Sequence, residues 1–257
     1  MEIPDFHWDT GTAGCRFPII VRRKEIRKKK QYTFDEVMEI LHSLAKPENL
    51  EGMARFGITG DKRLGLSMPE LRKLGRSIGK DHKMALKLWA TGIQDAMILA
   101  ALVDDPLQVT EEQADSWVKD IETWDVCDQL CVNLFEKISF ADKKILEWSG
   151  REEEFVRRVA YAIIACIAWH NKEAQDEDMM KYFPVIKSGA TDNRNYVKKA
   201  VSWALRHIGK RNPNLNREAI KLAKDIKEID SKAARWIASD VIRELEGEAV
   251  QKRLKKN

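Results

Sequence analysis

The sequence predicts an all-α protein built from stacked helix pairs, and three observations support this prediction. From Thr33 onward, apolar residues recur at helical spacing, and no alternating run of Val, Ile or Thr beside hairpin residues predicts a strand. Residues 155–160 resemble residues 196–201, which lie 41 positions further on. After the first 31 residues, the prolines lie at junctions between helical segments: Pro47, Pro69, Pro106, Pro184 and Pro213.

The individual helices can be placed from their start signals. Thr33 and Glu36 form a capping box ahead of the apolar stripe of the first helix. Pro69 lies in the first turn of a second helix, whose apolar stripe begins at Leu71. Further helices are expected at 82–90, 93–103, 111–120, 124–137, 140–149, 152–170, 175–188, 193–211, 214–227 and 231–247.

The repeat length indicates how these helices are arranged. Residues 232–236 form a weaker third copy of the repeated motif, and residues 94–100 form a degenerate earlier one. A period of about 40 residues with two helices per unit is typical of HEAT and armadillo repeats. Because each unit buries its apolar face only against its neighbours, we expect a HEAT-like α-solenoid, a curved superhelix of antiparallel helix pairs.

Composition excludes several classes of protein. The 257 residues are 44% hydrophobic and 33% charged, which is typical of a soluble globular chain, and no apolar run is long enough to span a membrane. Cys127 and Cys131 are four residues apart, so they do not form a zinc-type C-x-x-C pair. Four cysteines are also too few for a disulfide framework, so we expect a reducing, cytoplasmic compartment. Phosphate-binding glycine loops are absent, which predicts no nucleotide cofactor. Cys166 and His170 lack a second ligand pair, so no metal site is expected.

Charge is unevenly distributed along the chain. Residues 32–186 carry 19 basic and 28 acidic side chains, whereas residues 187–257 carry 18 basic and nine acidic ones. A basic end on an acidic body favours a polyanion partner, although a solvated lysine surface gives the same composition. The repeat places Arg157 and Arg158 in register with Lys198 and Lys199. Stacking would align these pairs on one wall, which predicts a concave basic groove that suits a duplex backbone.

Three regions are expected: a leader at 1–31, a single repeat domain at 32–248 and a Lys-rich tail at 249–257. The leader carries eight basic and four acidic side chains but lacks the order of a secretory signal peptide. We expect it to be a flexible basic arm. The more specific alternative is an arm that contacts DNA.

The helix that starts at Trp124 carries the first candidate site. Trp124 and Asp128 lie four residues apart and therefore share a face of this helix. Asp125 lies in the first turn, where a carboxylate favours the helix dipole, so a capping role is expected for it. Asp128 precedes an apolar run, and beside a tryptophan it would be partly desolvated and functional, although its setting alone does not establish this.

A second candidate stripe follows in the helix at 193–211. Arg206 and Lys210 lie three and seven residues after Trp203, so all three share a face, and Arg211 adds a further cation. An indole flanked by cations suits a surface that follows phosphates. The remaining tryptophans are expected to pack between helices: Trp89, Trp117, Trp148 and Trp169.

Four motifs together resemble the AlkD-like DNA alkylation repair proteins, which are HEAT-like-repeat DNA glycosylases that remove cationic alkylpurines. These motifs are 64–72, Trp124-Asp125-x-x-Asp128, 156–160 and 199–206, within a resemblance from Thr33 to Glu246. The resemblance implies four catalytic-site residues: Asp128, Trp124, Arg158 and Trp203. It also implies that Phe56 borders the site and that Arg206 and Lys210 contact phosphates. Together with the basic pairs of the repeat, the expected DNA-binding residues are Phe56, Arg157, Lys198, Lys199, Arg206, Lys210 and Arg211.

The resemblance implies a monomeric glycosylase that hydrolyses the N-glycosidic bond of 3-methyladenine and 7-methylguanine in double-stranded DNA, without a cofactor. The spacing from Arg158 to Trp203 is longer than in similar members of the family, and some of its members bind branched DNA without glycosylase activity. The alternatives are therefore a non-catalytic HEAT-like protein that binds branched or damaged DNA, and a protein–protein scaffold.

Overall fold

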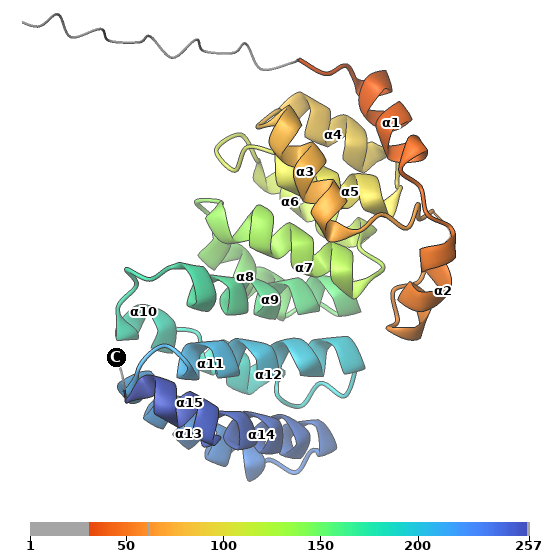
Figure 1. Ribbon diagram of the computed structural model, residues 1–257. Coiled ribbons are helices and arrows are strands. Elements are labelled where there is room, and N and C mark those ends of the chain that lie inside the picture. The colour runs from red at the N-terminus through yellow and green to blue at the C-terminus, as the bar shows by residue number, and fades with distance from the viewer. Residues whose placement is uncertain (1–30, 61, 256–257) are drawn as a thin grey trace, which may run out of the picture.

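The computed structural model describes residues 31–60 and 62–255 (Figure 1). The described residues form helices and connecting turns without any strand, so the prediction of an all-α fold is confirmed. Within the same ranges, no helix has both the length and the apolar character that a membrane crossing requires. The leader predicted at 1–31 lies outside the described residues except for Gln31.

The described part of the chain contains fifteen α-helices and two short 3-10 turns. In chain order they are α1 (Phe34–Ser43), α2 (Glu48–Arg55), α3 (Met68–Ile78), α4 (His82–Ala90), α5 (Gln94–Val103), α6 (Glu111–Trp117), η1 (Val118–Asp120), α7 (Trp124–Asn133), η2 (Phe135–Lys137), α8 (Ala141–Ser149), α9 (Glu154–His170), α10 (Asp176–Met180), α11 (Phe183–Gly189), α12 (Asn195–Gly209), α13 (Pro213–Lys227), α14 (Lys232–Leu245) and α15 (Glu248–Leu254).

The predicted helix starts agree with the structure at both positions where a signal was identified. The Glu36 backbone amide donates to Thr33 Oγ1 at 3.2 Å, and the Thr33 amide donates to Glu36 Oε2 at 2.9 Å, so the capping box of α1 is confirmed. Pro69 lies in the first turn of α3, which begins at Met68 as expected.

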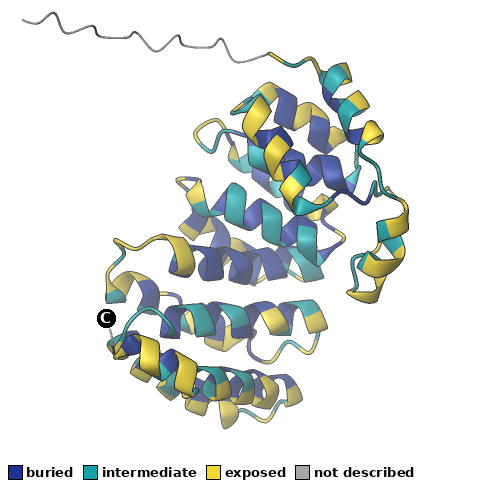
Figure 2. Cartoon of the chain, in the orientation of Figure 1, coloured by how far each residue is buried: buried dark blue, intermediate teal, exposed yellow. Residues whose placement is uncertain are grey.

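Six helices stack in sequence to form one continuous layer, which we call the central layer. It consists of α3, α5, α7, α9, α12 and α14, each packed on the next (Figure 1). A second layer supports it, because α4, α8, α11 and α13 pack on α5, α9, α12 and α14 respectively. Figure 2 shows that burial is concentrated along the inner parts of this stack, with exposed residues toward the outside. The arrangement is the stacked helix-pair architecture that the repeat predicts.

The repeated motif begins the two long helices at the middle of the stack. Phe155 starts α9 and Tyr196 starts α12, and their ring centroids lie 5.2 Å apart. Most of α9 is fully buried, because alanines such as Ala162 and Ala165 let the neighbouring helices approach closely. Residues that begin these helices are thereby placed side by side although they are about 40 positions apart in sequence.

Several helix boundaries differ from the sequence prediction. The helix expected at 175–188 is divided into α10 and α11, because Pro184 lies in the first turn of a new helix. The helix expected at 124–137 ends at Asn133 and continues as η2. The helix α2 was not predicted, and it has no buried residue that would create an apolar pattern.

The C-terminal boundary also differs from the expected one. Residues assigned to a Lys-rich tail form α15, which buries Val250 and Leu254 against the domain. Arg253 Nη2 also donates to the Lys210 carbonyl at 2.7 Å. The folded unit therefore extends past residue 248, since two apolar side chains among the lysines are enough to dock one short helix.

Three of the four tryptophans expected to pack between helices do so. Trp89 and Trp117 stack with ring centroids 4.1 Å apart, and Trp148 is 1% exposed. The expectation for Trp169 was wrong, because its side chain is 51% exposed. It lies near the end of α9, where no further helix covers it, and it stacks on His170 with centroids 4.7 Å apart.

Candidate functional site

An ion pair between Asp128 of α7 and Arg158 of α9 forms the centre of the candidate site. Arg158 Nη2 donates to Asp128 Oδ1 at 2.8 Å, and the two side chains are 6% and 20% exposed respectively. Burial raises the pKa of Asp128 above its usual range, while the charge and hydrogen bond of Arg158 act in the opposite direction. Desolvation is the larger effect, so the pKa of Asp128 stays above its usual range even beside this arginine.

The Arg158 guanidinium is fixed by contacts to two helices. Besides Asp128, it donates from Nη1 to the Tyr196 carbonyl at the start of α12 at 2.7 Å. Its Nε atom is buried and has no hydrogen-bond partner among the described residues. A bidentate contact of Arg158 with a phosphate would therefore compete with bonds that join α7, α9 and α12.

Trp124 lies one helical turn before Asp128 on α7. Its indole Nε1 donates to the Phe56 carbonyl at 3.0 Å, and the Phe56 ring is itself 76% exposed. The Trp124 indole is only partly buried, so it is not sealed between helices. Two aromatic side chains therefore lie at the solvent boundary near the carboxylate.

Residues 56–60 and 62–66 lie between α2 and α3, and several of them are anchored beside this site. Arg63 forms an ion pair with Asp125, with Nη1 2.8 Å from Oδ2 and Nη2 3.0 Å from Oδ1. Arg63 Nε also donates to Gln94 Oε1 at 2.6 Å. Asp125 thus holds Arg63, which is distant in sequence. The capping role expected for Asp125 is not seen as a hydrogen bond, because no side chain caps the start of α7.

Two further contacts hold the same segment against α5 and α12. The buried Asp95 carboxylate accepts the backbone amides of Leu64 at 2.7 Å and Leu66 at 2.9 Å. Gly57 has a φ of 73°, and a Cβ there would lie 2.8 Å from the Tyr196 hydroxyl. Close approach of the backbone to α12 therefore requires glycine at position 57.

Trp203 belongs to a separate aromatic group further along α12. Its ring meets His207 edge-on with centroids 5.7 Å apart, and His207 in turn contacts Trp169 at 5.8 Å. Burial lowers the pKa of His207 to about 4, assisted by the charges of Lys210 and Arg206, so this imidazole is neutral at pH 7. Among the described residues, no hydrogen bond or ion pair joins Trp203 to Asp128 or Arg158.

The cations expected to contact phosphates on α12 have carboxylate partners in the structure. Arg206 pairs with Glu244 and lies 3.4 Å from Asp240, and Lys210 lies 2.6 Å from Glu244 Oε1. Arg211 donates instead to three backbone carbonyls in and after the last turn of α9: Ala168, Asn171 and Ala174. Phosphate contacts by these three side chains would compete with intramolecular bonds.

The two aligned basic pairs diverge because adjacent helical residues point in different directions. Arg157 pairs with Asp192 at 3.3 Å, whereas Arg158 turns toward α7. Lys198 lies over the Trp236 ring, with its Nζ 4.9 Å from the centroid. Lys199 is exposed and has no charged partner within the described ranges.

Direct contacts thus pair Asp128 with Arg158 and Trp124 with the Phe56 carbonyl, whereas Trp203 contacts His207. Residues missed from the sequence include Tyr196, Arg63 and Asp95. The match between Phe155 and Tyr196 could have indicated that Tyr196 starts a stacked helix, whereas no local pattern identifies Arg63. No group of three or more His, Cys, Asp or Glu side chains in the described chain is arranged to hold a metal ion.

Comparison with known proteins places the chain in context. It is 28% identical to the uncharacterized protein Lin0241 of Listeria innocua and 30% identical to Lmo0209 of Listeria monocytogenes, each over 138 residues. Each alignment covers 51% of this chain and 60% of the relative.

A solved structure has a similar fold over most of this chain. It superposes with a TM-score of 0.68 at 18% identity, over 82% of this chain and 95% of the other. That protein is described as one of a family related to the HEAT-like repeat DNA glycosylases, with affinity for branched DNA structures. The predicted HEAT-like solenoid is therefore confirmed. The model of the DNA alkylation repair enzyme family matches residues 37–244, and this chain belongs to that family.

Proposed function

We propose that the protein is a DNA glycosylase that releases cationic alkylpurines, of the 3-methyladenine and 7-methylguanine type, from double-stranded DNA. The observation that carries the proposal is the partly exposed carboxylate of Asp128, paired with Arg158 and adjacent to the Trp124 indole on the central layer. A scaffold protein has no need of such a desolvated ion pair at a solvent boundary. Membership in the DNA alkylation repair family supports the same conclusion.

The chemistry of the substrate explains why one carboxylate is enough. A purine alkylated at N3 or N7 carries a positive charge, so it leaves as a neutral base and needs no general acid. Positive charge then develops on the deoxyribose in an oxocarbenium-like state. An anion beside that sugar stabilises the charge and can orient the attacking water.

Each residue of the pair then has a distinct role in this mechanism. Asp128 supplies the negative charge, and the charge and hydrogen bond of Arg158 oppose the rise in the pKa of Asp128 that burial causes. Trp124 offers an aromatic face to the cationic base or sugar, worth about 1–2 kcal/mol when desolvated. The bond from Trp124 to the Phe56 carbonyl holds the indole in place.

A base-release assay tests the proposal. The wild-type protein is incubated with dimethyl-sulfate-treated duplex DNA, and released 3-methyladenine and 7-methylguanine are measured by chromatography. A duplex that contains uracil is the matched control, because uracil is neutral and leaves as an anion unless it is protonated. Release of the cationic bases but not of uracil is expected, and no release of any methylated base would refute the activity.

Binding of branched DNA without turnover is the second candidate. It is favoured by the bonds of Arg158 Nη1 to the Tyr196 carbonyl and of Nη2 to Asp128, which restrict how this guanidinium can turn toward a phosphate. The structural neighbour with affinity for branched DNA supports it as well. Tighter binding to a four-way junction than to a duplex of equal length, together with no base release, would favour this candidate.

A further inference from the structure

A cavity in the N-terminal half of the central layer is lined by cations and by no carboxylate. It has a volume of about 400 Å³ and lies where α3 meets the carboxyl ends of α5 and α7. Its lining residues are Arg72, Gly75, Arg76, Gly79, Lys80, Leu102 and Asn133. Two larger cavities elsewhere differ in this respect, since Asp142 and Glu136 line one and Asp176 and Glu177 line the other.

The two arginines of this cavity are available for a ligand. Arg72 and Arg76 are exposed residues one turn apart on α3, and neither has an ion-pair partner among the described residues. Gly75 lies between them, and its lack of a side chain lets α3 approach α5, because a Cβ there would lie 3.2 Å from Leu102 Cβ. The arginines therefore flank a surface where two helices are in close contact.

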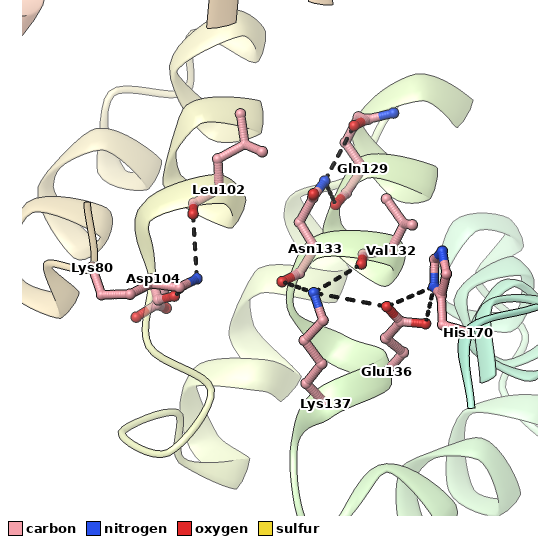
Figure 3. Close-up of polar contacts among 9 residues, drawn as sticks. All are labelled: Lys80, Leu102, Asp104, Gln129, Val132, Asn133, Glu136, Lys137 and His170. Carbon is pink, nitrogen blue, oxygen red and sulfur yellow. Dashed lines mark hydrogen bonds and ion pairs between the residues drawn. The ribbon is translucent and has the colours of Figure 1, made fainter. Parts of the chain in front are cut away.

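Lys80 adds a third positive charge that no carboxylate neutralises directly. Its Nζ donates to the Asp104 carbonyl at 2.5 Å and to the Leu102 carbonyl at 3.3 Å, both at the end of α5 (Figure 3). Lys137 also donates to two carbonyls, those of Val132 and Asn133 at the end of α7, and its Nζ lies 3.8 Å from Glu136 Oε1.

The two lysines also influence each other. Burial lowers the pKa of Lys80 and the positive charge of Lys137 lowers it further, while the more weakly acting carboxylates of Asp104 and Asp105 raise it. A bound anion would relieve this repulsion.

We propose that Arg72, Arg76 and Lys80 form a phosphate-binding row that holds the sugar-phosphate backbone of double-stranded DNA. This row lies in the part of the chain with net negative charge, so composition alone points away from it. The inference rests on the proposed action on DNA. It differs from the expectation drawn from the sequence, because it places the main contact with the DNA backbone on α3 instead of on the paired cations of α12.

The spacing of the row matches the proposed ligand. Four residues of helix separate the two arginines by about 6 Å along the axis. One strand of a duplex presents a phosphate about every 3.4 Å along its axis, so two phosphates lie within the span of the arginines. Guanidinium groups also bind phosphate oxygens in a bidentate manner.

Salt dependence of duplex binding tests this row directly. Arg72→Ala and Arg76→Ala are combined in one variant, and its affinity for an unmodified labelled duplex is measured by fluorescence anisotropy at several salt concentrations. Loss of two phosphate contacts is expected to reduce the slope of log affinity against log salt by about 1.8 and to weaken binding about 60-fold near 0.1 M salt. Both side chains are exposed, so an unchanged melting temperature is expected.

Lys73→Ala is the matched control, because Lys73 is an exposed cation of the same helix that does not line the cavity. Its slope is expected to equal that of the wild type. An unchanged slope in the double variant, an equal loss in the control, or a wild type that binds no duplex would each overturn the inference. The assay needs no base release, so absence of glycosylase activity alone would refute the proposed activity but not this row.

Discussion

The Asp128→Asn substitution tests the catalytic role of the carboxylate with little change of shape. A unit charge about 4 Å from the developing positive charge on the sugar is worth about 4 kcal/mol at an effective dielectric constant of about 20. Each 1.36 kcal/mol corresponds to a factor of about ten in rate, so removal of the charge should slow base release about 1,000-fold. Affinity for unmodified duplex DNA should remain within a few-fold of the wild-type value.

The cost of the same substitution in stability should be small. The amide oxygen of Asn can still accept from Arg158 Nη2, so a charge-assisted hydrogen bond becomes a neutral one, at a cost of about 1 kcal/mol. Loss of the burial penalty on the carboxylate, which raises the pKa of Asp128, offsets part of this cost. A decrease of about 2–4 °C in melting temperature is therefore expected for a domain of this size.

Asp240→Asn provides a matched control, because Asp240 lies on α14 of the same central layer. Asp240 accepts from the Ser202 hydroxyl at 2.7 Å and lies 3.4 Å from Arg206, and its side chain is 14% exposed compared with 20% for Asp128. This variant should lose similar stability and retain base release. Single-turnover release of 7-methylguanine from treated duplex measures both variants. Equal rates for Asp128→Asn and the wild type would refute the proposed mechanism.

Three further results are expected. Arg158→Met removes a charge that lowers the pKa of Asp128, so the acid limb of the pH profile of kcat/KM should move to higher pH. An acid limb that does not move would exclude Asp128 as the titrating group. Arg63→Met breaks the ion pair that anchors the segment beside the site, so amide hydrogen exchange of that segment should accelerate while exchange in α14 stays unchanged. Gly189→Ala places a methyl group within 2.1 Å of the Tyr161 hydroxyl and should cost about 1–3 kcal/mol in thermal or denaturant unfolding, whereas an unchanged melting temperature would contradict the close packing there.

Charge illustrates why composition and structure point to different surfaces. The C-terminal third has a net charge of +9, which favours a polyanion partner in that region. In the structure, Arg206 and Lys210 share Glu244 of the neighbouring helix, so much of that charge is neutralised internally. The exposed arginines of α3 lie in the net acidic part of the chain and are not neutralised in this way. Net charge counts side chains, whereas binding depends on which of them remain unpaired.

The sequence alone determined the fold class, because helical periodicity and the capping box at Thr33 arise from neighbouring residues and the repeat at residues 155 and 196 can be read by comparing two segments of sequence. It also placed Trp124 and Asp128 on one face of a helix, since four-residue spacing fixes that relation locally. The tertiary structure decided the partners of these residues. Arg158 pairs with Asp128 across 30 residues, and Arg63 pairs with Asp125 across 62. Such contacts depend on the stacking of helices and the path of a loop, which no local pattern encodes, so the composition of the site follows only from the packed fold.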